Sequence, residues 1–146
     1  MDREQIKNIL PHREPMLLVD ESYLEDEGKA HGKYTVRGDE FFVQGHFPGT
    51  PVVPGVILCE MASQSACAMT AEQMMSGKLP LFAGMNNVRF KTPVRPGDTV
   101  EFECELKRKM AACFVINAKG TVGGKLCMSG EFTFFLVDKS ALSSAN

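Results

Sequence analysis

The chain has 146 residues, with 16 Lys and Arg against 18 Asp and Glu, so its formal net charge is −2 at pH 7. A nearly balanced charge excludes the strongly basic surface typical of nucleic-acid binders. No apolar run approaches the roughly 20 residues of a membrane span. The N-terminus has no apolar signal core, and the five cysteines include no Cys-x-x-Cys pair. We therefore expect one cytoplasmic domain over residues 1–146 with reduced cysteines and a frayed tail at 140–146, and neither nucleic acid nor membrane as partner.

The first quarter of the chain predicts a short helix and a hairpin. A helix over residues 3–9 follows Asp2, which can cap it, and Gln5 lies at the capping-box position. Strands are expected over 16–25 and 29–36, where apolar and polar residues alternate around a glycine turn.

A Gly- and Pro-rich loop over residues 37–54 leads into an apolar stretch from Pro54 to Met75. We predict one long helix here, with Pro54 as its first residue, because a missing N–H has no cost at that position. The only charged residues inside it are Glu60 and Glu72. A helix that is apolar on nearly every face must be covered on every face, so a sheet is expected to wrap it.

The second half of the chain alternates with a period of two, which is typical of strands. The predicted strands cover residues 79–90, 100–107, 114–122 and 126–136, and Gly123-Gly124 marks a tight hairpin. One long buried helix with five to six antiparallel strands places the chain in the α+β class.

The residues with the strongest chemical signal surround the start of the predicted helix. His46 precedes the rigid loop, Gly55 lies in the first helical turn, and Glu60 lies one to two turns further on. The backbone N–H of Gly55 has no partner within the helix and carries the positive end of its dipole. A base, an acid and an oxyanion donor within fifteen residues predict proton transfer beside a carbonyl group.

Glu60 has no obvious cation among its neighbours in the sequence. Burial without a cation disfavours the charged form, so we predict that its pKa is raised and that it serves as a general acid. The alternative is a structural carboxylate that pairs with a distant arginine.

The remaining candidates favour structural interpretations. His12 and His31 are interpreted as structural histidines. For His46 the sequence supports a functional and a structural role equally. Cys59 is expected to be a small buried helix residue rather than a nucleophile. The spacing of histidines and cysteines does not suggest a metal site, and no cofactor is expected.

Basic residues cluster after the third predicted strand. Arg89, Lys91 and Arg95, together with the run Lys107-Arg108-Lys109, could dock an acidic partner. A solvated sheet edge explains the same pattern equally well.

Several motifs together resemble one enzyme family. The central motif is Gly45-His46-Phe47-Pro48-Gly49-x-Pro51-x-x-Pro54-Gly55-Val56, with Glu60 and Gln64 downstream. The flanking motifs are Leu10-Pro11-His12-Arg13-x-Pro15-x-Leu17-Leu18-Val19-Asp20, Leu81-Phe82-Ala83-Gly84 and Arg89-Phe90-x-x-Pro93-Val94-x-Pro96-Gly97-Asp98. Over residues 5–137 this pattern resembles the FabZ-type (3R)-hydroxyacyl-acyl-carrier-protein dehydratases. Met85-Asn86-Asn87 departs from the Ile-Asp-Lys common in that family.

The resemblance implies a hotdog fold, in which an antiparallel sheet wraps a long helix. It also implies a homodimer, or a trimer of such dimers, with the His and Glu of each site on different subunits. The implied substrate is a β-hydroxyacyl chain on the phosphopantetheine arm of acyl carrier protein, in fatty acid or lipid A precursor synthesis.

The resemblance also implies roles for individual residues. Neutral His46 removes the α-proton, Glu60 of the partner subunit protonates the departing hydroxyl, and the Gly55 N–H binds the enolate oxygen. We also expect Phe47, Pro54 and Gln64 to bind the substrate or support the site. If the basic patch is a docking surface, Arg89, Lys91 and Arg95 would dock the carrier protein.

Two other functions remain open on the sequence alone. A hotdog thioesterase would use a carboxylate and water to cut the thioester, and an acyl-binding sensor would have no activity. The position of His46 beside the Gly55 loop counts against both. The related dehydratase-isomerases have Asp at the position of Glu60, so dehydration without isomerisation is expected.

Overall fold

The computed structural model describes residues 1–143, which form one six-stranded antiparallel sheet with five α-helices and one 3-10 helix. The strands are β1 (Glu21–Leu24), β2 (Ala30–Thr35), β3 (Lys78–Phe90), β4 (Thr99–Met110), β5 (Cys113–Val122) and β6 (Lys125–Asp138). The helices are α1 (Arg3–Ile6), α2 (Phe41–Gln44), α3 (Gly55–Ser65), η1 (Ala66–Met69), α4 (Ala71–Met75) and α5 (Lys139–Ser143). The strand order β1-β2-β4-β5-β6-β3 leaves β1 and β3 at the edges.

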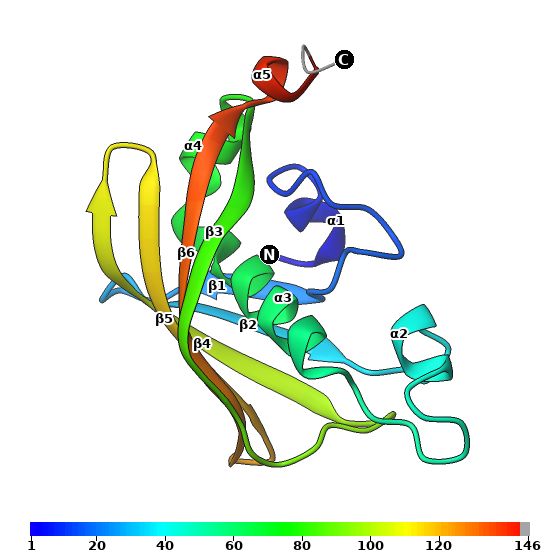
Figure 1. The fold of residues 1–146 in the computed structure, drawn as a ribbon. Helices are drawn as coiled ribbons and strands as arrows, with labels where there is room; N and C mark the ends of the chain where they lie inside the picture. Colours follow the sequence, from blue (N-terminus) through cyan, green and yellow to red (C-terminus); the bar gives the residue numbers. More distant parts are fainter. Residues whose placement is uncertain (144–146) are drawn as a thin grey trace.

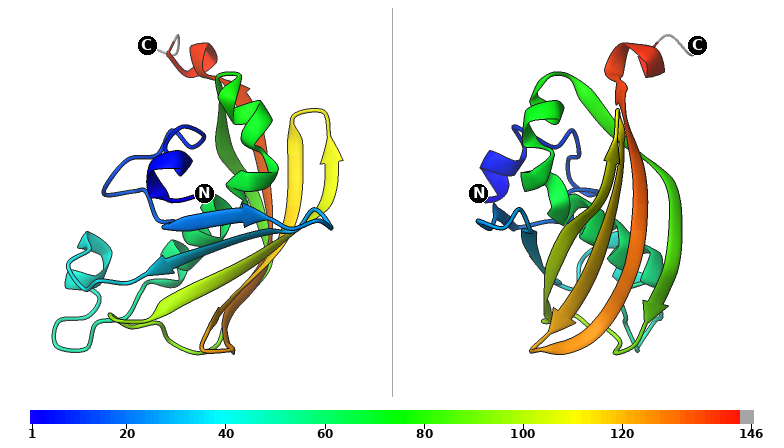
Figure 2. Two further views of the ribbon diagram at one scale, coloured as in Figure 1. Left: turned by 180° about the vertical axis from the view of Figure 1, so that it is seen from behind. Right: turned by 90° about the vertical axis from the view of Figure 1, so that its left-hand side faces the viewer.

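The sheet curves strongly, and α3 lies in its concave face (Figure 1). All helices except the terminal α5 lie on this side of the sheet (Figure 2). The core between the sheet and α3 contains side chains from both layers. The largest fully buried ones are Tyr34, Phe102, Phe132, Ile6, Leu17, Leu18, Met61, Ile116 and Met128. This arrangement confirms the predicted α+β fold, because each inward face of an alternating strand has an apolar helix to pack against.

The strands follow the predicted alternation closely. Ala30, Gly32 and Tyr34 of β2 are buried, as the pattern indicated. The β5–β6 hairpin turns at Gly123 and Gly124, whose φ values of 56° and 82° require a residue that tolerates the left-handed region. The first strand is shorter than predicted, since residues 16–20 approach the core without joining the sheet.

The predicted helix from Pro54 to Met75 is wrong in its length. The α-helix begins at Gly55, with Pro54 as an extended N-cap, and ends at Ser65 before a 3-10 turn and the short α4. The Ser65 hydroxyl donates to the Met61 carbonyl, and the Thr70 hydroxyl donates to the Cys67 carbonyl. Such bonds compete with regular helical pairing, which accounts for the break at this point.

The expectation that the sheet would cover the helix on every face is also wrong within one chain. Val56 of α3 is 71% exposed, and Ile57, Glu60 and Ser63 are only partly buried. The edge strand β3 is exposed over most of its length, including Leu81, Phe82, Met85 and Phe90. Helix α3 and the edge strand therefore leave apolar surface that this chain does not cover.

Most of the segment predicted to be a frayed tail is helical. Residues 139–143 form α5 where the sequence led us to expect a frayed tail, and the rest of that expectation, 144–146, lies outside the described residues. None of the helices between residues 1 and 143 combines the length and apolarity needed to cross a membrane.

Candidate active site

The loop before α3 is closed by a tight turn. Phe47 and Thr50 exchange backbone hydrogen bonds of 3.3 and 2.9 Å across Pro48-Gly49. Gly49 has φ of +80°, and Pro followed by such a glycine is typical of a type II turn. The Val53 N–H donates to the Val94 carbonyl at 2.8 Å, which fixes the loop to the segment after β3. The rigid loop predicted from its prolines and glycines is therefore also anchored to the rest of the fold.

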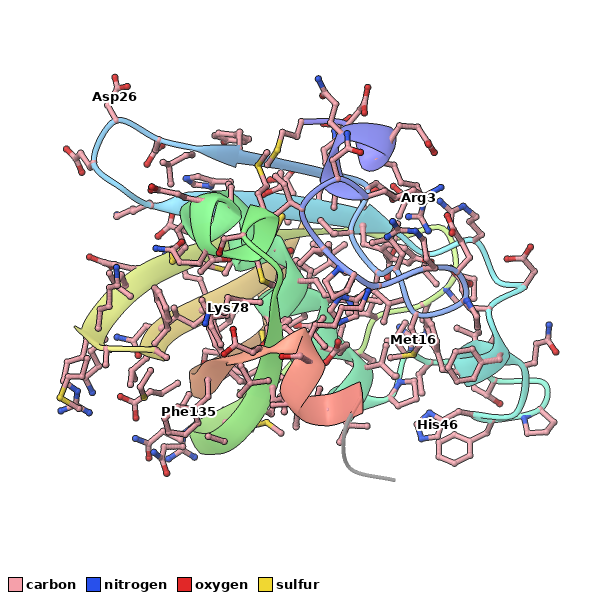
Figure 3. The ribbon with its side chains drawn as sticks, turned by 90° about the horizontal axis from the view of Figure 1, so that it is seen from above. Arg3, Met16, Asp26, His46, Lys78 and Phe135 are labelled. Atoms are coloured by element: carbon pink, nitrogen blue, oxygen red, sulfur yellow. The ribbon has the colours of Figure 1, made fainter. Side chains whose placement is uncertain are left out.

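His46 is oriented by the backbone of its own loop. Its Nδ1 lies 3.1 Å from the Val52 carbonyl oxygen, and the Val52 N–H donates to the His46 carbonyl at 2.8 Å. Because a carbonyl oxygen accepts, Nδ1 carries the hydrogen, and in the neutral imidazole Nε2 then has the lone pair. The imidazole stacks on Phe47, with ring centroids 4.2 Å apart. Figure 3 shows His46 at the periphery of the chain.

Gly55 is the first residue of α3, and its N–H donates to no acceptor within residues 1–143. Pro54 precedes it in an extended conformation, and the Pro54 carbonyl accepts from Ile57 and Leu58. A Cβ at Gly55 would lie 2.8 Å from the Phe90 ring. A side chain at position 55 would therefore displace the Phe90 ring, a contact that the sequence did not reveal.

The carboxyl group of Glu60 is held by Gln64, one helical turn away. The Gln64 amide nitrogen donates to Glu60 Oε1 at 3.0 Å and to the Met16 carbonyl at 2.8 Å, while the Gln64 oxygen accepts from the Leu18 N–H at 2.7 Å. The Leu18 donor and the Met16 acceptor leave only one orientation for this amide. Gln64 is 2% exposed, so it is fixed in place and fixes Glu60 in turn.

Glu60 lines a cavity between α3, the N-terminal loop and the strands β3 and β6. Its walls are mostly apolar, and the polar side chains in it belong to a few residues of the helical layer and the loop. The lining residues are Leu10, His12, Glu60, Ser63, Gln64, Cys67, Thr70, Met74, Pro80, Phe82 and Phe134. An apolar cavity with a few convergent polar groups is typical of a ligand site.

The predicted raised pKa of Glu60 is wrong for the single chain. Burial raises the pKa, but hydrogen bonds from His12 and Gln64 outweigh it, so the pKa of Glu60 lies below its ordinary value. The sequence argument considered only neighbours along the helix, and His12 is 48 positions away in the chain. Its Nε2 lies 3.3 Å from Glu60 Oε1.

The interpretation of His12 as a purely structural histidine is therefore incomplete. Its place beside Glu60 depends on a tertiary contact that periodicity cannot reveal. The available signal was its position in the Leu10-Pro11-His12-Arg13 motif, which the family resemblance already included.

The three basic residues predicted to dock a partner flank the Gly55 loop. Arg89 and Lys91 lie at the end of β3, and Arg95 lies in the loop whose Val94 carbonyl holds Val53. All three are exposed, and no carboxylate in the described part of the chain forms a salt bridge with them.

One chain does not bring all the predicted site residues together. Glu60 and Gln64 line the cavity, whereas His46, Phe47 and Gly55 do not. Cys59 is buried, and burial raises its pKa to about 11, which agrees with an unreactive thiol. Over residues 1–143, no three His, Cys, Asp or Glu side chains are grouped so that they could hold a metal ion.

Comparison with known proteins identifies the family. Residues 10–131 match the model of the FabA-like domain. The chain belongs to the FabA-like family. Relatives named 3-hydroxyacyl-[acyl-carrier-protein] dehydratase FabZ include those of Bacillus cereus (strain AH820), 45% identical over 95% of this chain and 98% of the relative, and Natranaerobius thermophilus, 41% identical over 94% and 99%. These matches confirm the resemblance to FabZ-type dehydratases.

Solved structures of other proteins share the fold at low sequence identity. A chain of the dehydratase heterocomplex ApeI:P from Xenorhabdus doucetiae has a TM-score of 0.78 at 19% identity and covers 94% of both chains. A mutant of the fluoroacetyl-CoA-specific thioesterase FlK has a TM-score of 0.68 at 14% identity, over 86% of this chain and 95% of that one. Since dehydratases and thioesterases share this fold, only the sequence relatives and the site residues distinguish the two activities.

Proposed function

We propose that this protein is a 3-hydroxyacyl-[acyl-carrier-protein] dehydratase of fatty acid biosynthesis, formed by one hotdog domain over residues 1–146 and acting in the cytoplasm without a cofactor. The observation that carries the proposal is the Glu60 carboxyl group, held by Gln64 at an apolar cavity in a chain 45% identical to FabZ dehydratases. The same identity disfavours the thioesterase and the sensor. The (3R) stereochemistry and the absence of isomerisation are part of the proposal.

The reaction begins at His46. With Nδ1 donating to the Val52 carbonyl, Nε2 is free to take the proton from C2 of the substrate. The electron pair of that C–H bond forms the C2–C3 double bond as the C3–O bond breaks. Developing negative charge on the thioester oxygen is stabilised by the free Gly55 N–H and the dipole of α3.

Glu60 completes the reaction by giving its proton to the departing hydroxyl, which leaves as water. His46 then carries a proton and Glu60 is ionised, so one proton must return before the next turnover. In the single chain the pKa of Glu60 is lowered. An apolar acyl chain that excludes water from the cavity would raise it and favour the acid form.

Each site is proposed to be shared by two subunits. His46 and Glu60 do not meet in one chain, and α3 and the edge strand β3 expose apolar side chains. A second copy that covers this surface around a two-fold axis would bring the His46 loop of one subunit to the Glu60 cavity of the other. Such dimers can associate further into a trimer of dimers.

The substrate arrives on acyl carrier protein. Arg89, Lys91 and Arg95 are exposed next to the anchored Gly55 loop and form no salt bridge within residues 1–143, which supports a docking patch for an acidic carrier. Lys107 is less suited to this role, because it already pairs with Glu131 at 2.6 Å. Phe47 and Pro54 would shape the entrance for the phosphopantetheine arm.

The proposal is tested by incubating the purified protein with a trans-2-enoyl thioester on acyl carrier protein. A dehydratase hydrates the double bond reversibly, so the ultraviolet absorbance of the conjugated enoyl thioester decreases and 3-hydroxyacyl product appears. Release of free thiol instead would identify a thioesterase, and binding without conversion would identify a sensor. Either of those results would contradict the proposed activity.

A further inference from the structure

The contact between His12 and Glu60 is built by distant parts of the chain. His12 lies in the loop between α1 and β1, and its Nε2 is 3.3 Å from Glu60 Oε1. Both side chains are about four-fifths buried and line the same cavity. The resemblance to known dehydratases assigned His12 no role.

Arg13 fixes the loop that carries His12. Its guanidinium donates to the carbonyls of Leu10 and His12 at 2.9 and 2.7 Å, and to that of Lys7 at 3.0 Å. Three carbonyls bound by one planar group leave this turn little freedom. The position of the His12 ring is therefore determined by the loop, before any substrate binds.

No other polar contact explains why a histidine is needed here. The His12 Nδ1 atom is buried and has no hydrogen-bond partner among residues 1–143. Buried polar atoms are usually satisfied, so the polar contacts of Nδ1 do not explain the choice of histidine. The polar contact that the imidazole makes is with Glu60.

The two neighbours of Glu60 act on the same oxygen. The Gln64 amide can only donate to Oε1, because Leu18 and Met16 fix its orientation. His12 Nε2 faces this oxygen too, and a nitrogen beside an acceptor oxygen is favourable only as N–H. The other oxygen, Oε2, receives no hydrogen bond from the described residues.

From this geometry we propose that His12 is a positioning residue, which holds Glu60 Oε1 as an acceptor and leaves Oε2 to carry the transferred proton. The inference rests on the proposed function and names how its acid is prepared. An oxygen that accepts two N–H groups binds a proton poorly, so the proton resides on Oε2. The donors also strengthen Glu60 as an acid, because they stabilise the carboxylate that remains after transfer.

The other groups around Glu60 do not compete with this role. Burial raises the pKa of both nearby thiols, Cys59 and Cys67, so both are neutral at pH 7. The side chains that α4, β3 and β6 contribute to the cavity have no charge: Met74, Pro80, Phe82 and Phe134. Ser63 and Thr70 also line the cavity, but the Thr70 hydroxyl donates to the Cys67 carbonyl and the Ser63 hydroxyl has no hydrogen-bond partner among residues 1–143. Within the described part of the chain, the side chains that contact the carboxyl oxygen Oε1 are therefore His12 and Gln64.

The test compares His12→Leu, which removes the donor, with His12→Gln, which keeps a side-chain N–H. His31→Leu is the matched control, because His31 Nε2 also lies 3.3 Å from a glutamate, Glu25, but does not line the Glu60 cavity. The pKa of Glu60 is measured by NMR on protein with 13C-labelled glutamate carboxyl groups, assigned with Glu60→Gln. Turnover is measured in parallel over a range of pH.

In His12→Leu the pKa of Glu60 is expected to rise. Activity is lost at alkaline pH when the acid Glu60 loses its proton, so the alkaline limb of the pH profile of kcat/KM should move to higher pH. We expect kcat to fall about tenfold to a hundredfold with KM nearly unchanged, since a misplaced acid weakens only the transition state. His12→Gln should stay close to wild type, and His31→Leu should match it. If His12→Leu does not fold, His12→Asn replaces it, because its shorter amide cannot reach Oε1.

If the pKa of Glu60 and kcat stay at wild-type values in His12→Leu, the proposed role of His12 is overturned. Equal changes in His31→Leu would overturn it too, because they would reveal a general effect of losing a buried histidine. The NMR titration needs no turnover. An inactive wild-type protein would therefore count against the dehydratase function, whereas an unchanged pKa in an active enzyme would count against His12 alone.

Discussion

The two proposed proton-transfer groups are held in opposite ways. His46 is positioned by its own loop, through hydrogen bonds with Val52 six residues away. Glu60 is positioned by the buried Gln64 and by His12, and Gln64 in turn depends on the backbone of Met16 and Leu18. The base is thus held locally near the surface, whereas the acid is held by the buried Gln64 and by a contact between distant parts of the chain.

This difference suggests a division of labour. A base on an anchored loop at the periphery can meet a substrate or a second subunit without disturbing the core. An acid that must change its pKa with the environment benefits from a cavity whose walls exclude water. The following predictions test how far the two groups differ.

The largest effect is expected from separating the two groups between subunits. Homodimers of His46→Ala and of Glu60→Gln should each lose about 10²- to 10⁴-fold in kcat, because every site lacks a base or an acid. Mixed in equal amounts with subunit exchange, half the dimers become mixed, and each mixed dimer contains one intact site. Activity should recover to about a quarter of wild type by this symmetry.

Subunit exchange is verified by native mass spectrometry with one variant isotope-labelled. Exchange without any recovered activity would mean that His46 and Glu60 act within one chain. The base and the acid of each site would then belong to the same subunit.

The second prediction concerns stability. Replacing Gln64 by Leu leaves the buried Leu18 N–H and the partly buried Met16 carbonyl without the partner they have in the wild type, which should lower the free energy of unfolding by about 2–4 kcal/mol. His46→Ala removes one partly exposed hydrogen bond and should cost about 1 kcal/mol or less. Urea unfolding followed by circular dichroism measures both.

Gln44→Leu provides the control for the chemical change itself. Gln44 is exposed, and its side-chain amide donates to the Asp39 carbonyl at 2.7 Å. This variant should stay within about 0.5 kcal/mol of wild type. If Gln64→Leu lowered the free energy of unfolding as little as Gln44→Leu, the hydrogen bonds of Gln64 would contribute little to the stability of the protein.

The smallest effect is expected at the rim of the His46 loop. Reversing the charges of Arg89, Lys91 and Arg95 should raise KM for the carrier-bound substrate about tenfold and weaken its dependence on salt. Turnover of a small pantetheine thioester should hardly change, because the site itself is intact. Steady-state kinetics on both substrates measures the contrast.

Charge reversal over Lys107-Arg108-Lys109 at the β4–β5 hairpin is the comparison for this experiment. A larger rise in KM for the hairpin variant would show that the carrier protein docks at the hairpin instead. If reversing the charges of Arg89, Lys91 and Arg95 reduces turnover of both substrates equally, these residues support the fold and do not dock the carrier protein.

The sequence by itself determined the parts of the protein that depend on local patterns. The alternation of β2 and β4 to β6 specified strands, because a period of two places apolar side chains on one face. The rigidity of the loop before α3 followed from the backbone preferences of its prolines, although the helix begins at Gly55, one residue later than predicted. Family motifs supplied the chemistry of the His46 loop, whereas its anchor at the Val94 carbonyl depended on the tertiary structure.

Only the tertiary structure decided what surrounds Glu60. The helix break after Ser65 depends on side-chain bonds to backbone carbonyls, which helical periodicity does not encode. The exposure of α3 around Val56 depends on which faces of the helix the curved sheet covers, and this is a property of the tertiary structure. The direction of the Glu60 pKa depended on His12, brought within 3.3 Å across 48 positions of sequence. Electrostatic shifts act through space, so the order of residues along a helix could not determine them.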